Sequence, residues 1–224
     1  MRKLAVLFVA LWLALPSTAS AVTPLVSPVP AAESAGSLDI LRVQARYDVP
    51  KDRFYIQRTI LAATWEYESF YASLGYIATT DFDDVGDGTL PDPQPAGDSG
   101  SMLAVGARGA LWRSGEFSFN GDLQLHVLNE QVESNGVRYS MQSHEAILGV
   151  AAAWQRRPWR AYAGVDTVPY TNISMKAPGF EDMGRTDFII VHAGGGVDIG
   201  PFLLDADVQF VGAEGIRVSL GYAF

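Results

Sequence analysis

The stretch GIRVSLGYAF, residues 215–224, decides the fold of this chain. Read in steps of two, one face of an extended strand would carry Ile216, Val218, Leu220, Tyr222 and Phe224. The other face would carry Arg217, Ser219, Gly221 and Ala223. A period of two is typical of a β-strand. Because one whole face is apolar, the stretch predicts a strand with that face against an apolar medium.

The same alternation continues through most of the chain. It is clear in FLLDADVQF (202–210), FSFNGDLQLHV (117–127) and WRAYAGVDTV (159–168). Turn signals divide the chain into ten expected strands, near 40–49, 58–68, 70–80, 102–113, 117–129, 137–155, 158–171, 187–198, 202–211 and 215–224. Eight strands beginning near Phe70 are the alternative. Ten are favoured because the turn between 58–68 and 70–80 is too short to separate them.

The distribution of residue types over the two faces predicts the architecture. One face carries Asp, Arg, Gln and His from nearly every strand, and the other is apolar with aromatic residues near the strand tips. This pattern predicts an all-β fold, a transmembrane antiparallel up-and-down β-barrel whose apolar face meets lipid. A soluble β-sandwich is the alternative, but its strands are usually shorter. A membrane barrel must close, because open edges leave backbone groups unpaired in hydrocarbon.

The N-terminal segment predicts export. Residues 1–21, MRKLAVLFVALWLALPSTASA, have the charged start, short apolar run and small-residue end of a signal peptide removed near Ala21. Residues 22–37 are rich in Pro, Ala and Ser and predict a flexible periplasmic leader, with the barrel over 38–224. The chain has no cysteine, so no disulfide stabilises it. Its net charge of −9, which would become −11 without Arg2 and Lys3, argues against nucleic-acid binding.

With its signal peptide, strand pattern and terminal VSLGYAF, the sequence resembles the small outer-membrane β-barrels of Gram-negative bacteria, the OmpA/OmpX type. The resemblance implies that Tyr222 and Phe224 form a signal for the barrel-assembly machinery. It also implies an outer-membrane monomer in contact with lipid and lipopolysaccharide. Its short turns would be periplasmic and its longer loops extracellular. The family includes lipid A-processing enzymes and omptin-type proteases as well as barrels without catalytic activity.

Alternation predicts which charged residues face the barrel interior. They are Arg42, Arg46, Arg58, Glu66, Arg108, Asp122, His126, Arg160, Asp166, His192, Asp205, Asp207 and Arg217. A barrel of eight to ten strands has little internal space, so these groups are expected to pair and fill a polar lumen. The alternative is a narrow passive channel lined by the same groups.

Catalytic and metal sites are weakly indicated. Ser143 and His144 are neighbours on a strand and would point to opposite faces, so they cannot form a dyad. The Asp-rich segment 81–98 could hold a divalent cation through Asp81, Asp83, Asp84 and Asp87, although the spacing is not that of an EF-hand. We therefore expect a non-enzymatic, cofactor-free barrel with a structural or surface-interaction role, with a channel and a lipid A- or peptide-processing enzyme as alternatives.

Overall fold

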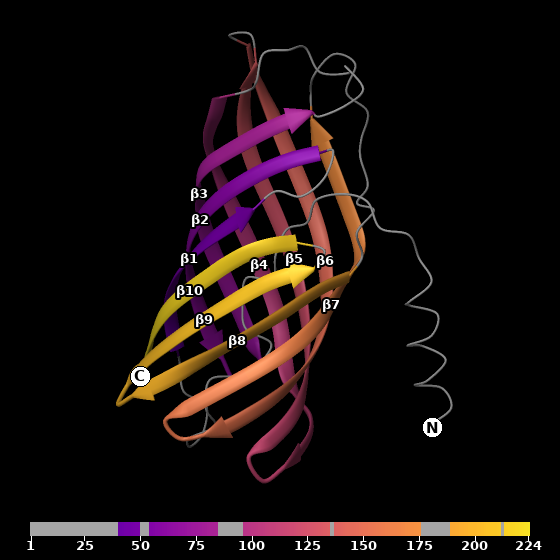
Figure 1. Cartoon of the computed structure of the whole chain (residues 1–224). Helices are drawn as coiled ribbons and strands as arrows, with labels where there is room; N and C mark the ends of the chain where they lie inside the picture. The colour runs from indigo at the N-terminus through magenta and orange to yellow at the C-terminus, as the bar shows by residue number, and fades with distance from the viewer. Residues whose placement is uncertain (1–39, 50–53, 85–95, 135–136, 176–188, 212) are drawn as a thin grey trace, which may run out of the picture.

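The computed structural model describes residues 40–49, 54–84, 96–134, 137–175, 189–211 and 213–224, which form ten strands. They are β1 (Ile40–Val49), β2 (Phe54–Tyr67), β3 (Phe70–Asp84), β4 (Ala96–Ser114), β5 (Phe117–Ser134), β6 (Val137–Arg156), β7 (Trp159–Met175), β8 (Ile189–Ile199), β9 (Phe202–Val211) and β10 (Ala213–Ala223). Each pairs with its neighbours in chain order to form a closed barrel (Figure 1). The prediction of ten strands is confirmed, and the eight-strand alternative is wrong because β1 and β2 belong to the wall.

The barrel closes through the C-terminal strand, β10. β10 pairs antiparallel with β1, from Ile40 opposite Ala223 to Val49 opposite Glu214, and with β9 on its other side. Both edges of β10 are therefore hydrogen-bonded, as the interior of a membrane requires. At its end Tyr222 makes edge-to-face contacts with Phe202 and Phe224, at ring-centroid separations of 5.4 and 5.1 Å.

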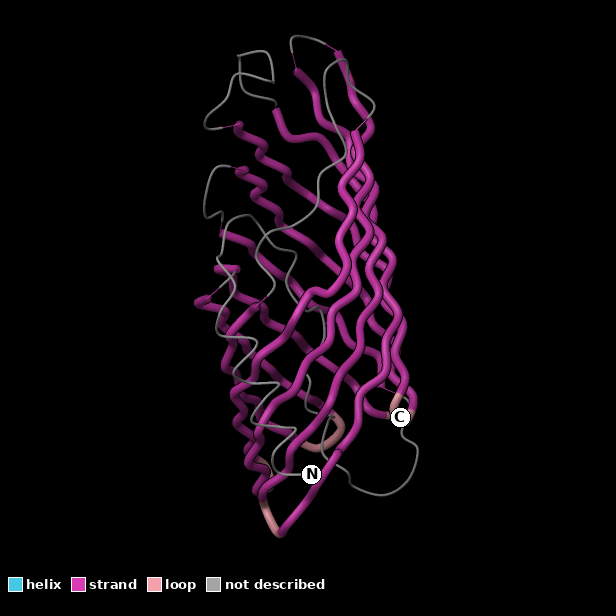
Figure 2. Tube along the Cα trace, turned by 90° about the vertical axis from the view of Figure 1, so that its right-hand side faces the viewer, coloured by secondary structure: helices cyan, strands magenta, loops and turns pink. Residues whose placement is uncertain are grey.

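Four two-residue turns lie at one end of the barrel, which we call the turn end. They join β2 to β3, β4 to β5, β6 to β7 and β8 to β9, and the C-terminus lies at the same end (Figure 2). Gly115 and Gly200 supply the positive φ angles, 59° and 62°, of two of these turns. The strands at the opposite end are longer than expected, since β3 runs to Asp84 and β4 begins at Ala96. The predicted connection over 81–101 was therefore too long.

The wall is much taller on one side than on the other. β9 has 10 residues and β6 has 20. At about 3.3 Å per residue and a tilt of about 40°, β9 rises about 25 Å, the height of an apolar band, whereas β6 rises about 50 Å. Half of β6 must therefore project beyond the membrane. No helix among the residues placed by the structure is long and apolar enough to cross a membrane.

The outward face of the barrel changes character along the tall strands. Near the turn end it is apolar, and the exposed outward side chains there include Phe117, Phe119, Leu123 and Leu125 on β5 and Leu148 and Val150 on β6. We call this part the belt section. Farther from the turns the exposed outward side chains are polar, namely Ser101, Asn129, Gln131, Arg138, Ser140 and Gln142. We call this part, formed by the ends of β4–β7, the upper section. Asn129 and Gln142 are hydrogen-bonded at 2.8 Å on its surface.

Candidate functional site: the barrel interior

The structure buries most of the charged residues that were predicted to face the lumen. Buried among the described side chains are Arg58, Glu66, Arg108, Asp122, His126, Arg160, Asp166, His192, Asp205, Asp207 and Arg217. Arg42 and Arg46 lie on β1, opposite Gly221 and Arg217, and their side chains are outside the described part of the structure. The predicted signal peptide and the predicted leader also lie outside the described residues.

The ion pairs nearest the turn end are centred on Arg160 of β7. Its Nε and Nη2 donate to Asp205 Oδ1 at 2.8 and 2.6 Å, and its Nη1 donates to Asp198. Ser219 of β10 also contacts Asp205 Oδ2 at 3.5 Å. These bonds connect β7 to β8, β9 and β10 across the interior. A single guanidinium thus pairs with two carboxylates there.

A second cluster surrounds His192 of β8. Its Nδ1 lies 3.1 Å from Asp207 Oδ2, and its Nε2 lies 3.4 Å from Asp166 Oδ2. Arg217 Nη2 lies 3.9 Å from Asp207 Oδ2 and donates to Tyr162 Oη at 3.0 Å. The imidazole is held between two carboxylates from different strands, so the cluster connects β7 through β10.

A third network covers the opposite wall. Arg108 of β4 pairs with Glu66 of β2, and the Arg108 guanidinium lies 5.8 Å from the centre of the Tyr71 ring. Tyr71 donates to Asp122 Oδ1 at 3.2 Å, and Gln124 donates to Asp122 Oδ2. His126 Nε2 is 3.1 Å from Gln124 Oε1. Tyr71 was not among the predicted interior residues, because the prediction was limited to charged residues and histidines.

Inward-facing glycines make room for these side chains. A β-carbon at Gly164 would lie 2.4 Å from His192 Nε2, and one at Gly106 would lie 2.2 Å from the Tyr71 ring. Likewise a β-carbon at Gly194 would lie 2.4 Å from Tyr162 Oη. In each pair the large residue stands opposite the glycine on the adjacent strand. The lumen is therefore filled by side chains lying flat over glycine positions.

Farther from the turns, the interior becomes largely apolar, which the alternation of charged residues did not predict. Ile60, Ala62, Ile77, Met102, Ala104 and Leu128 form one buried cluster with Tyr71, and Ile147, Val168 and Ile190 form another. Beside the first, Arg58 of β2 and Glu130 of β5 form a bidentate pair at 2.7 to 3.1 Å. The predicted polar lumen is therefore present near the turn end and does not extend through the whole barrel, because the part above it buries apolar residues as a soluble barrel does.

The arrangement offers no activated nucleophile among the residues placed by the structure. Ser143 is buried and its Oγ makes no hydrogen bond. It faces inward, whereas His144 is partly exposed on the other face, as the strand period predicts. His192 is buried between two carboxylates rather than beside a serine or threonine hydroxyl. A hydrolytic site needs a nucleophile hydrogen-bonded to a base and open to substrate.

The described residues contain no group of three or more His, Asp or Glu side chains able to hold a metal ion. Asp81, Asp83 and Asp84 lie on β3 rather than in a loop, and nothing is described of their side chains. Asp87 lies outside the described residues. The divalent-cation site therefore stays a prediction.

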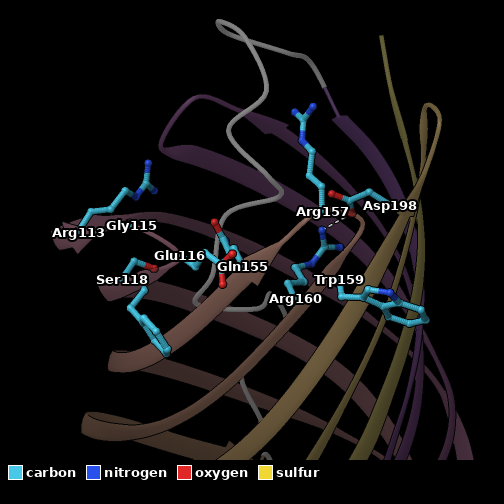
Figure 3. A pocket seen from close by; sticks show the side chains of 10 residues that line it. Arg113, Gly115, Glu116, Ser118, Gln155, Arg157, Trp159, Arg160 and Asp198 are labelled. Atoms are coloured by element: carbon cyan, nitrogen blue, oxygen red, sulfur yellow. Dashed lines mark hydrogen bonds and ion pairs between the residues drawn. The ribbon is translucent and has the colours of Figure 1, made fainter.

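A pocket of about 200 Å³ opens at the turn end, between the β4–β5 and β6–β7 hairpins and the end of β8 (Figure 3). It is lined by Arg113, Gly115, Glu116, Phe117, Ser118, Gln155, Arg157, Trp159, Arg160 and Asp198. The two hairpins are joined by a hydrogen bond from Gln155 N to Glu116 O at 2.8 Å. The pocket thus has a fixed wall and lies at the mouth of the polar part of the lumen.

Comparison with known proteins finds a likeness in architecture. No protein-family model matches the chain, and no curated protein matches it. Among solved structures, the β-domain of the Bordetella autotransporter BrkA is 13% identical, with a TM-score of 0.44 and coverage of 85% of this chain and 99% of that one. The translocator domain of NalP from Neisseria meningitidis is 16% identical, with a TM-score of 0.46 and coverage of 87% and 91%.

The outer-membrane protease OmpT from Escherichia coli is 9% identical, with a TM-score of 0.42 and coverage of 86% of this chain and 99% of that one. These likenesses concern the barrel fold and do not single out the OmpA/OmpX type. The pairing of ten strands into a closed wall with an apolar belt makes this chain a transmembrane antiparallel up-and-down β-barrel.

Proposed function

We propose that this chain is a non-enzymatic outer-membrane barrel with a sealed interior, which serves a structural role or presents its upper section to surface partners. The observation that carries the proposal is the apolar layer of Ile60, Ile77, Met102 and Leu128 above the polar part of the lumen. Ions cross such a layer with difficulty because it offers no groups to replace their hydration shell. The adjacent Arg58–Glu130 pair spans from β2 to β5 and further fills the cross-section.

The same proposal includes an orientation. The turn end and the C-terminus face the periplasm, and the upper section faces outward with its polar exterior toward lipopolysaccharide and the medium. Export uses the signal peptide, insertion uses the barrel-assembly machinery, and the protein acts as a monomer. The tall β4–β7 wall supports this proposal because a 50 Å strand leaves about half its length outside an apolar band of about 25 Å.

The test is the conductance of the refolded protein in a planar lipid bilayer. We expect no current steps from the wild type. Replacing Met102 and Leu128 together with serine should admit water through the apolar layer and produce steps, whereas Leu125→Ser on the outward face of β5 should not. Steps from the wild type would refute the seal and favour the narrow passive channel. A changed lipid A mass spectrum in expressing cells would instead favour an enzyme.

A further inference from the structure

The pocket at the turn end plays no part in the sealed-barrel proposal, and its charge differs from that of the chain. Three arginines and two acids line it, although the chain as a whole carries a net charge of −9. A local excess of positive charge on an acidic protein attracts anions to that place.

Both acids of the pocket already have partners. Asp198 pairs with the buried Arg160, which also binds Asp205. Glu116 accepts a hydrogen bond from Trp154 Nε1 at 2.9 Å and lies 3.6 Å from Arg156 Nε. Residues of the wall therefore hold both carboxylates. As a result, the carboxylates compete less strongly with an anionic ligand for the arginine side chains at the pocket opening.

Arg157 supplies the charge that can bind a ligand. It lies in the β6–β7 turn with its side chain exposed, and it has no ion pair with any residue in the described ranges. Figure 3 shows Arg157 and Arg113 on different hairpins around the pocket. A guanidinium presents a planar fork of donors that fits the oxygens of a phosphate. Ser118 and Gln155 add neutral hydrogen-bonding groups to the lining.

The surroundings of the pocket indicate where the phosphate comes from. Phe117 and Trp159 line it and are 59% and 60% exposed, at the end of the apolar belt. Aromatic residues at this height lie in the interfacial region, among lipid headgroups. We propose that this pocket binds the phosphodiester headgroup of an anionic phospholipid, with Arg157 and Arg113 on the phosphate and Phe117 and Trp159 against the start of the acyl chains.

The experiment uses the whole refolded protein in detergent. Phosphatidylglycerol is added and its binding is measured by native mass spectrometry for the wild type, Arg157→Gln, Arg157→Lys and Arg138→Gln. Arg138 is the control, since it is an exposed arginine at the far end of the barrel. We expect Arg157→Gln to weaken binding about tenfold, the loss of one charge-assisted contact, and Arg157→Lys to weaken it less. Arg138→Gln should leave it unchanged.

Inorganic phosphate, followed by phosphorus NMR, distinguishes the two sources of the anion. The proposal predicts weak binding of free phosphate and strong binding of the lipid. If inorganic phosphate binds as tightly as phosphatidylglycerol, the lipid assignment is wrong. Equal loss in Arg157→Gln and Arg138→Gln, or no loss in either, also overturns it. Each variant is first checked for the heat-modifiable gel shift of a folded barrel, and none of these outcomes depends on whether the lumen conducts.

Discussion

The ion pair between Arg58 and Glu130 gives the most direct test of how the upper part of the lumen is built. The side chains are 4% and 0% exposed, and they share two hydrogen bonds from Nε and one from Nη2. Arg58→Met leaves a buried carboxylate without its main partner, and Glu130→Leu leaves a buried guanidinium. Each single change should therefore cost about 3–5 kcal/mol of unfolding free energy.

The double variant should behave differently from the sum of the singles. In the double variant, unbranched methionine replaces Arg58 and leucine replaces Glu130. Both apolar side chains would pack against the neighbouring cluster of Ile60, Ile77 and Leu128. Replacing a buried pair by apolar groups is often neutral or stabilising, so the double change should cost about 1 kcal/mol or less. The coupling energy of the cycle, which is the sum of the two single costs minus the double cost, then amounts to about 5 kcal/mol or more.

The assay is urea unfolding of the refolded protein in lipid vesicles, followed by tryptophan fluorescence and by the gel shift. The matched control is Arg156 and Glu116, a pair at 3.6 Å whose side chains are 71% and 48% exposed. Its coupling should be below about 1 kcal/mol. Additivity at Arg58 and Glu130 within about 0.5 kcal/mol would show that the two groups do not depend on each other, and would refute the packing described for this layer.

Three further predictions concern the wall. Val208→Arg places a charge on the apolar belt and should lower the free energy of unfolding by about 2–4 kcal/mol if the site is near the midplane. Asn129→Arg on the polar upper section should change it by no more than about 0.5 kcal/mol, and equal costs for the two variants would place the membrane boundary elsewhere. Gly164→Ala would place a β-carbon 2.4 Å from His192 Nε2, so the free energy of unfolding measured in urea should fall by about 1–3 kcal/mol. An unchanged midpoint of the urea transition would mean that the imidazole ring moves freely. Deleting Phe224 removes the partial burial of its ring, which contributes about 1–2 kcal/mol to stability, so the yield of refolding in detergent should change little. The abundance of the protein in the outer membrane should nevertheless fall sharply, and normal abundance would argue against an assembly signal.

The sequence alone determined the wall of the belt section. In FLLDADVQF (202–210) the alternation of apolar and polar residues predicts the same two faces that the structure shows. Leu204 and Val208 face outward, and Asp205 and Asp207 face inward. A strand has a period of two whatever its neighbours are, so both the strand and its two faces are local properties. The number of strands followed from counting such segments.

The upper section could not be predicted in the same way. Residues 96–101, AGDSGS, have the composition of a loop, yet they lie within β4. Outside the bilayer a strand has no need of an apolar outward face, so the signal that marked the belt is absent there. Glu130 lies two positions along β5 from Leu128, and the inward face of the strand continues through both. Extending the alternation beyond His126 would have placed both Leu128 and Glu130 inside the barrel.

Tertiary structure decided which charges meet. Arg58 and Glu130 are 72 residues apart in the chain, and Arg160 and Asp205 are 45 apart. Alternation places all four residues inside, but their partners depend on the register of strands that are not neighbours in sequence and on the space left by glycines such as Gly164 and Gly106. Which face is buried is a local property of the strand period and the solvent, whereas which side chains touch across the lumen depends on how the whole barrel closes.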